Sequence, residues 1–258
     1  MDESRIAREQ EFWDGAFEEP TRSSAWGFYA TAKTSAEYHR NLVLEDCEGK
    51  SALEFGCSAG SFAFELAGRG ANVTGIDLSQ NAIEAARKQA KAKDLAENTV
   101  FEVMDAEDLT FAAGTFDLVY GRSILHHLDI AKALGAIVRV LKPGGRAVFC
   151  EPLGHNPFIN LYRRLTPRMR CEDEHPLTKR DLDTMRDFFA TVDIRYFHLV
   201  SLVAAPFRKL PGFAVLRRCL ETVDRGLFKM PFMRRQAWIA VITLSAPMTG
   251  ARSDHPDH

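Results

Sequence analysis

The chain has 258 residues and a mass near 28.9 kDa, enough for one large α/β domain. Hydrophobic residues make up 46% of the composition and charged residues 26%, which excludes an intrinsically disordered or collagen-like protein. The formal net charge of −2 excludes a protein that binds nucleic acid through a strong overall positive charge.

The start of the chain and the cysteines give no sign of export. The chain begins with acidic residues and no apolar run follows them, so we expect neither a secretory signal nor a transit peptide. No stretch approaches the ~18 consecutive apolar residues of a membrane-spanning helix. The five cysteines are odd in number and show no CxxC or CxxH spacing, so we expect reduced thiols and no metal site. The expected location is the cytoplasm.

Charge is distributed unevenly along the chain. Residues 1–162 hold 16 basic and 24 acidic residues, whereas residues 163–235 hold 16 basic and 9 acidic ones. The positive excess of the second segment is typical of a solvated surface, and it also suits an anionic substrate or membrane. We therefore expect a small-molecule substrate and no nucleic-acid partner, with peripheral membrane contact as an open alternative.

The first 45 residues contain scattered aromatic side chains without strand-like alternation, which predicts short helices and loops that form a lid. From residue 46 short apolar runs alternate with helical periodicity. Strands are expected over residues 51–56, 71–77, 99–105, 116–121 and 146–151. This alternation predicts a parallel sheet with helices on both faces, and ligands bound at the carboxyl ends of its strands.

Side-chain caps mark where several helices should begin. We expect caps at Ser79, Asp129 and Asn156, opening helices that reach Ala90, Leu141 and Leu165 respectively. Two late strands are expected over residues 191–202 and 237–244.

The turn after the first strand carries glycines at positions 56 and 60, which allow a ligand to approach the backbone closely. A dinucleotide fingerprint requires the pattern G-x-G-x-x-G, but serine occupies positions 58 and 61. The turn therefore disfavours an NAD-dependent oxidoreductase.

Three acidic residues lie at or near successive strand ends, namely Glu54, Asp77 and Asp105. A carboxylate after the second strand can accept both ribose hydroxyls, and one after the third can accept the exocyclic amine of adenine. The expected ligand is therefore an adenosine without a phosphate.

Five motifs occur in one order between residues 50 and 152. They are Leu53-Glu54-Phe55-Gly56-Cys57-Ser58-Ala59-Gly60, Gly75-Ile76-Asp77-Leu78-Ser79, Met104-Asp105-Ala106-Glu107-Asp108-Leu109, Phe116-Asp117-Leu118-Val119-Tyr120 and Leu141-Lys142-Pro143-Gly144-Gly145-Arg146. Together they resemble the class I S-adenosylmethionine-dependent methyltransferases, in the branch that methylates quinones and other small molecules. The resemblance implies an α/β fold with a seven-stranded Rossmann-like sheet of order 3-2-1-4-5-7-6, the last strand antiparallel, and a helical cap.

The resemblance also implies S-adenosyl-L-methionine as the cofactor. Asp77 is the expected ribose ligand, Asp105 with Ala106 the adenine clamp, and Glu54 either contacts the ligand or orients the turn. The family usually has glycine in place of Ser58, so we expect a reshaped site around the methionine end. The predicted cofactor-binding residues are Glu54, Gly56, Cys57, Gly60, Asp77, Leu78, Asp105, Ala106 and Gly121.

Two adjacent histidines, His126 and His127, follow the fourth strand, where a methyl acceptor would lie. Methyl transfer is an in-line displacement that mainly needs alignment and a desolvated site. A base is needed only if the acceptor must lose a proton, and a histidine can serve as that base, although such pairs also occur in packing roles. Both are candidate catalytic residues, and the candidate substrate contacts are Tyr29, His155 and Tyr162.

A late helix should carry an apolar stripe, which either packs on its own domain or serves an apolar acceptor. Its members are Phe213, Leu216, Leu220, Val223 and Leu227, with Arg217, Arg218 and Arg225 off the stripe. The expected organisation is a helical lid over residues 1–45, a cofactor-binding core over 46–152, a substrate cap with the sixth strand over 153–235, the last strand over 236–247 and a disordered tail over 248–258.

These observations predict an enzyme that transfers a methyl group from S-adenosylmethionine to a small, hydrophobic or lipid-like acceptor. A non-catalytic module that binds an adenosine cofactor is the first alternative. The others are an NAD-dependent oxidoreductase, which would lack its glycines, and an RNA methyltransferase, for which no basic stripe with stacking aromatic residues is visible.

Overall fold

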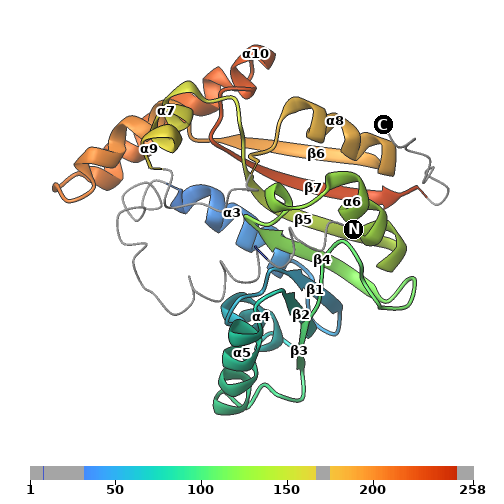
Figure 1. Cartoon of the computed structure of the whole chain (residues 1–258). Coiled ribbons are helices and arrows are strands. Elements are labelled where there is room, and N and C mark those ends of the chain that lie inside the picture. Colours follow the sequence, from blue (N-terminus) through green and yellow to red (C-terminus); the bar gives the residue numbers. More distant parts are fainter. Residues whose placement is uncertain (1–7, 9–31, 167–174, 249–258) are drawn as a thin grey trace.

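The computed structural model describes residue 8 and residues 32–166 and 175–248. Strands in these ranges form one sheet of order β3-β2-β1-β4-β5-β7-β6 (Figure 1). Strands β1 to β5 pair in parallel, and β7 runs antiparallel to both β5 and β6. The predicted sheet and strand order are therefore confirmed. The strands are β1 (Ser51–Phe55), β2 (Asn72–Asp77), β3 (Thr99–Val103), β4 (Phe116–Arg122), β5 (Leu141–Pro152), β6 (Phe189–Phe197) and β7 (Ile239–Pro247).

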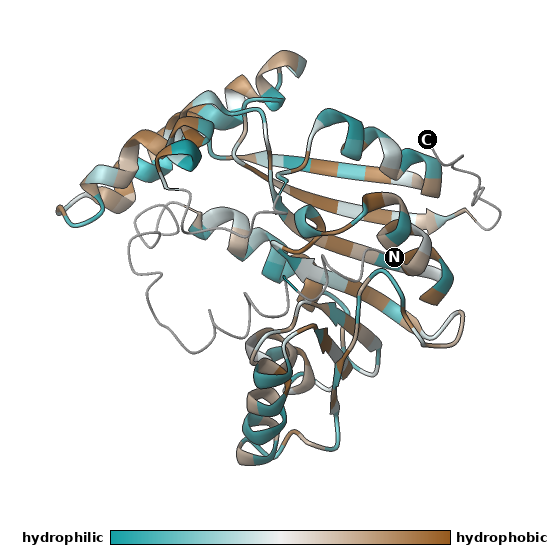
Figure 2. Ribbon diagram, in the orientation of Figure 1, coloured by the Kyte–Doolittle hydropathy of each residue, from teal (hydrophilic) through white to brown (hydrophobic). Residues whose placement is uncertain are grey.

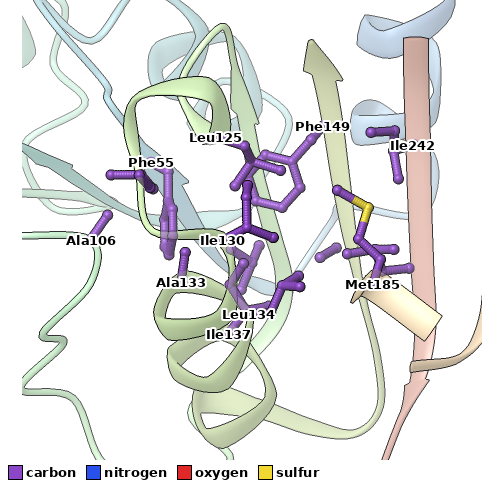
Figure 3. Close-up of a cluster of buried hydrophobic side chains, with 14 of the residues drawn as sticks. Phe55, Ala106, Leu125, Ile130, Ala133, Leu134, Ile137, Phe149, Met185 and Ile242 are labelled. Carbon is purple, nitrogen blue, oxygen red and sulfur yellow. The ribbon is translucent and has the colours of Figure 1, made fainter. Parts of the chain in front are cut away.

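Helices cover both faces of this sheet. Because side chains alternate along a strand, Leu53 and Phe55 of β1 enter one core, whereas Ala52 enters the other. Figure 3 shows Phe55 in the first core together with Ala133 and Met185. The helices of this first core are α6 (Ile130–Val140) and α8 (Lys179–Phe188), and those of the second are α3 (Lys33–Leu44), α4 (Ser61–Ala67) and α5 (Gln80–Ala92).

Part of the predicted lid belongs to the core. Helix α3 buries Ser35, His39, Val43 and Leu44. Two of these four side chains are polar, so the buried face does not stand out in the hydropathy pattern. The Nε2 atom of His39 lies 3.3 Å from the carbonyl oxygen of Val148, which satisfies a polar group inside the core. The rest of the predicted lid, residues 1–7 and 9–31, lies outside the described residues.

The predicted caps are confirmed, but one helix is shorter than predicted. The side chains of Ser79, Asp129 and Asn156 each accept a hydrogen bond from a backbone N–H of the helix that they open. The helix after Asp129 ends at Val140, because Leu141 already pairs with β4 as the first residue of β5.

The strand predicted over residues 191–202 is also shorter at its carboxyl end. It stops at Phe197, because His198 adopts a left-handed backbone conformation with φ of 64°. The chain then forms the 3-10 helix η4 (Val200–Phe207) instead of continuing the strand.

A helical cap stands at the carboxyl edge of the parallel strands. Pro152 at the end of β5 and Phe197 at the end of β6 both lie opposite Ile239 at the start of β7. The segments that leave or enter these strand ends therefore emerge at one edge, and Figure 1 shows them toward one side of the molecule. They are α7 (Pro157–Leu165), η4, α9 (Phe213–Leu227) and α10 (Pro231–Arg234).

Helix α9 is attached by its polar side. The carboxylate of Asp224 accepts hydrogen bonds from the backbone N–H groups of Leu199, Val200 and Ser201, the shortest 2.7 Å long. The guanidinium of Arg217 bonds Thr34 of α3 and Glu221. Arg217 and Asp224 are only 8% and 3% exposed, whereas the predicted apolar stripe is half-buried or exposed. The stripe therefore does not pack as ordinary core, and Arg217 is not a surface residue.

His198 links this attachment to α3. Its Nε2 atom lies 3.0 Å from the hydroxyl of Ser35, and its Nδ1 atom 3.4 Å from the hydroxyl of Ser201. Burial, together with the charge of Arg217, lowers the pKa of His198 to about 3. Burial also lowers the pKa of His39 to about 4.

We expect the folded state to lose stability in acid. Below about pH 6.5 the unfolded chain binds a proton on His198 that the folded chain does not bind until about pH 3. The free energy of unfolding should therefore fall by up to about 1.4 kcal/mol per pH unit in this window, and His198→Gln should remove that contribution. Denaturant unfolding at several pH values measures the slope. His155→Gln, at an exposed histidine, is the control, and an unchanged slope in the His198 variant would contradict this account.

Candidate functional site

The structure brings the three predicted acids to neighbouring strands. Glu54 lies in β1, Asp77 ends β2 and Asp105 follows β3 by two residues. In the sheet, β2 lies between β1 and β3, so all three acids approach the carboxyl edge of one half of the sheet. This is the edge at which parallel α/β sheets bind ligands.

Asp77 holds the turn between β1 and α4. The backbone N–H of Ser58 donates to its Oδ2 atom over 2.8 Å, and that of Ser79 donates to its Oδ1 atom over 3.0 Å. A carboxylate has about four lone-pair sites, so these bonds are compatible with ligand hydroxyls on the same side chain. Within the turn, Gly56, Ser58 and Gly60 all have left-handed backbone conformations, with φ of 63°, 48° and 79°.

The glycines near the turn are required by packing within the chain. A Cβ atom on Gly60 would lie 2.9 Å from the ring of Phe101, and one on Gly121 would lie 2.7 Å from the side chain of Ile124. The space beside both glycines is therefore filled by the protein itself. Their roles in cofactor binding stay predictions, and the acids provide the more direct chemical fit to an adenosine.

Glu54 is buried beneath the turn. Its Oε2 atom accepts a hydrogen bond of 3.1 Å from the hydroxyl of Tyr120, and it is also bonded by the backbone of Ala63 in α4. Burial is the main cause that raises the pKa of Glu54 to about 8. With only 7% of the residue exposed, this arrangement fits the orienting role considered for Glu54 better than a direct ligand contact.

The other predicted cofactor residues surround these acids. Cys57 is buried, and burial raises the pKa of its thiol. Leu78 is half-buried directly after Asp77. Asp105 accepts a 2.8 Å hydrogen bond from the backbone of Glu107 at its Oδ1 atom. Ala106 lies in the same core as Phe55 (Figure 3).

The histidine pair lies at the same carboxyl edge, after β4. It belongs to the 3-10 helix η2 (Leu125–His127), and both rings are buried with their centroids 4.2 Å apart. The Nδ1 atom of His126 lies 2.8 Å from Oε2 of Glu151. Because a carboxylate only accepts hydrogen bonds, Nδ1 carries the proton and Nε2 is the basic nitrogen of His126.

Glu151 is the residue that the sequence analysis missed. It is fully buried at the end of β5, and its Oε1 atom accepts hydrogen bonds from the backbone N–H groups of Ile124 and Leu125 at 2.9 and 3.1 Å. It therefore fixes the turn that carries His126 as well as the ring itself. The available signal was a carboxylate at the end of an otherwise apolar run, residues 147–150.

The three candidate substrate contacts have different outcomes. Tyr29 lies outside the described residues. His155 is exposed, and its Nε2 atom accepts a 3.1 Å hydrogen bond from the backbone of Lys179 at the start of α8. Tyr162 is half-buried in α7. Across residues 32–166 and 175–248, no cluster of three His, Cys, Asp or Glu side chains is placed to hold a metal ion.

The family comparison covers most of this region. A family described as "Methyltransferase domain" matches residues 53–149, which include the turn, the three acids and the histidine pair. This stretch resembles a methyltransferase domain. The resemblance to the class I S-adenosylmethionine-dependent methyltransferases, stated for residues 50–152, is thereby confirmed.

Known proteins are similar to parts of the chain. The O-methyltransferase cnsE of Penicillium expansum is 38% identical over 116 residues, which are 44% of this chain and 42% of that protein. A ubiquinone biosynthesis O-methyltransferase of Thiobacillus denitrificans is 39% identical over 110 residues, 42% of this chain and 46% of that protein. The chain thus spans less than half of the length of these relatives.

The fold is shared over almost the whole chain. The crystal structure of geranyl diphosphate C-methyltransferase from Streptomyces coelicolor matches with a TM-score of 0.62. The match covers 94% of this chain and 97% of that one at 13% sequence identity. The cap and the late strands therefore lie within a fold that this neighbour shares.

We expect Ser58→Gly to leave the fold intact and to stabilise it by up to about 1 kcal/mol, because a left-handed conformation is strained for serine and not for glycine. Gly60→Ala is the opposite change in the same turn. It should destabilise the fold, because φ is also positive there and the new Cβ would contact Phe101 at 2.9 Å. Denaturant unfolding of the two variants measures both effects. A loss of stability in Ser58→Gly would reveal a contact of the serine side chain.

Proposed function

We propose that this protein is an enzyme that transfers a methyl group from S-adenosyl-L-methionine to a small, hydrophobic or lipid-like acceptor. The observation that carries the proposal is the placement of Asp77 and Asp105 on adjacent strand ends beside a left-handed turn. This placement lies within the stretch that resembles a methyltransferase domain.

The chain's own residues fit the cofactor. Asp77 would accept hydrogen bonds from the ribose hydroxyls, and Asp105 would accept one from the adenine amine. Glu54 would keep the turn in place through Tyr120 and α4. When bound, the cofactor supplies an electrophilic methyl group on a sulfonium. The protein's contribution is to align the acceptor with that group and to exclude water.

His126 is the proposed base for acceptors that must lose a proton. Its bond to Glu151 orients the ring and favours the tautomer whose Nε2 atom accepts a proton. The same carboxylate would stabilise the imidazolium that forms. His127, whose ring lies tilted against that of His126, is proposed to hold that ring in place.

The proposed acceptor class rests on the cap. Segments at the carboxyl edge carry many exposed apolar side chains, among them Phe158 in α7 and Phe232 in α10. One relative is named for ubiquinone biosynthesis, and the structural neighbour is named for geranyl diphosphate. We propose the cytoplasm as the setting, with the cap in peripheral contact with a membrane. Among the described cysteines, Cys47, Cys57, Cys150 and Cys219 are free thiols, which fits a reducing compartment.

S-adenosylhomocysteine should raise the melting temperature of the protein, whereas NAD and NADP should not, because only a ligand of the folded state stabilises it. Asp77→Ala should weaken S-adenosylhomocysteine binding about 10- to 100-fold, the cost of losing charge-assisted hydrogen bonds of ~1.5 to 3 kcal/mol. Isothermal calorimetry measures the affinity.

Two further variants control for the role of Asp77 in the turn. Asp77→Asn keeps one acceptor oxygen and should lose less affinity than Asp77→Ala. Asp108→Ala removes an exposed acid nearby and should leave affinity unchanged. Stabilisation by NAD alone would overturn the proposal. Cofactor binding without turnover on amines, phenols, isoprenoids and lipids would favour the non-catalytic alternative.

For an acceptor with an acidic proton, His126→Ala should lower the turnover rate about 100-fold and change cofactor affinity by less than about twofold. His127→Ala should have the smaller effect, because Glu151 is bonded to His126. Glu151→Gln keeps the shape but removes the charge, so it should shift the pH dependence of turnover. If alanine at both histidines leaves the rate within a factor of about two, the pair does not act as a base.

A further inference from the structure

The outward surface of residues 200–235 carries charge of one sign. This segment comprises η4, α9, α10 and the loops between them, and we name its exposed part the cap surface. Every exposed charged residue in it is basic. The two acids of the segment, Glu221 and Asp224, are turned inward instead. The basic residues are Arg208, Lys209, Arg218, Arg225, Lys229, Arg234 and Arg235.

The internal bonds of the cap explain this separation of charge. Asp224 is used by the backbone of residues 199–201 and by the hydroxyl of Ser201, at 2.6 Å. Glu221 is used by Arg217 and Thr34. Neither acid is available to neutralise the outer arginines and lysines. The segment is basic by composition, and the attachment of α9 keeps its two acids away from the exposed surface.

The same attachment leaves apolar side chains outside. A surface helix normally buries its apolar face and exposes its charges, but α9 buries Arg217 and Asp224 and leaves every residue of its apolar stripe half-buried or exposed. Neighbouring segments continue the pattern, with Phe232 of α10 63% exposed. The exposed large apolar residues of the cap surface are Val203, Phe207, Leu210, Val215, Leu216, Val223, Met230 and Phe232.

Helix α7 extends this surface. Its first turn is joined to the end of the cap by a 2.7 Å hydrogen bond from the side-chain amide of Asn156 to the carbonyl of Gln236. Phe158 is 76% exposed, Leu161 and Leu165 are also exposed, and the exposed charge of α7 is Arg164. Figure 2 shows brown apolar and teal polar residues interleaved on α7, α9 and α10.

We propose that the cap surface docks on an anionic lipid membrane. The exposed apolar side chains can insert into the interface of such a membrane. The basic residues, with no exposed acid among them, are attracted to its anionic headgroups. A second copy of the chain would bring the same positive charge and is repelled. Docking would be peripheral, since no helix in the described ranges is long and apolar enough to cross a membrane.

The cap surface adjoins the carboxyl edge that carries the candidate site. The ends of β5 and β6 and the start of β7, which lead into it, meet at that edge. Docking would therefore bring the acceptor side of the proposed enzyme to the lipid. The docking proposal does not depend on the proposed methyl transfer, so an experiment can contradict either proposal without contradicting the other.

Flotation of the full chain with lipid vesicles tests the proposal. The protein should float with phosphatidylcholine vesicles that contain about 30% phosphatidylserine, and not with pure phosphatidylcholine vesicles. High salt should weaken this binding. Arg218→Glu with Arg225→Glu should weaken it at least about tenfold. Lys88→Glu with Lys91→Glu, which makes the same charge change on exposed positions of α5, should leave it nearly unchanged.

A second pair of variants tests the apolar contribution. Val215→Ser with Val223→Ser removes two exposed valines from α9 and should weaken flotation several-fold. Val100→Ser with Val103→Ser makes the same change at exposed positions of β3 and should not. A thermal shift with S-adenosylhomocysteine, retained in all four double variants, shows that the cofactor half of the protein is intact.

Several outcomes would overturn the proposal. One is no binding of the unaltered chain to anionic vesicles, and another is equal loss in the cap and control variants. Another is binding to anionic vesicles that appears only after removal of residues 1–31, which would mean that this segment, and not a membrane, is the partner of the cap surface. Self-association that the α9 variants abolish would assign it to a second copy.

Discussion

Burial of β1 from both sides is the constraint on which the candidate site depends. Because β1 lies between β2 and β4 and beneath helices on both faces, all of its side chains except that of Ser51 are buried. A carboxyl group in such a place must be satisfied internally. Glu54 meets this requirement through Tyr120 of β4 and the backbone of α4. These bonds fix where α4 begins, and the short left-handed turn between β1 and α4 follows from that position.

A second polar attachment governs the cap. Asp224 and Arg217 hold α9 to η4 and α3 where a typical helix would use apolar packing. Buried polar groups of this kind must be completely bonded, so they specify one placement of the helix. As a result, no residue of the apolar stripe is fully buried. The internal bonds of the cap therefore contribute to its surface chemistry.

Much of the fold could be predicted from the sequence, because its signals were local. Apolar runs that end in glycine or in an acid gave the strands of the parallel sheet, and serine, aspartate and asparagine caps gave the helix starts. The elements that differ depend on distant partners. The strand of residues 189–197 ends early because Asp224, far along the chain, bonds the backbone that follows His198. The role of α3 was hidden for the same reason, since the ring of the buried His39 contacts the carbonyl oxygen of Val148, which lies far along the chain.

Some residues of the candidate site could be predicted from the sequence, and others could not. Asp77 and Asp105 could be placed from spacing alone, because the carboxyl ends of parallel strands meet at one edge. Glu151 could not, because its function depends on a contact with His126 across 25 residues of chain. No local pattern distinguishes a carboxylate that orients a histidine from one that ends a strand.

The sheet order separates the three acids from the pair His126 and Glu151. The acids come from β1 to β3, whereas His126 and Glu151 come from β4 and β5, and the chain reverses its direction of strand addition between β1 and β4. A crevice outside the strand ends forms at such a reversal, where a cofactor on one side can meet an acceptor on the other. The cap begins at the ends of β5 and β6, so it borders the acceptor side and not the cofactor side. A cap that holds the protein at a lipid surface would raise the local concentration of an apolar acceptor there, without any change in the residues proposed to perform the transfer.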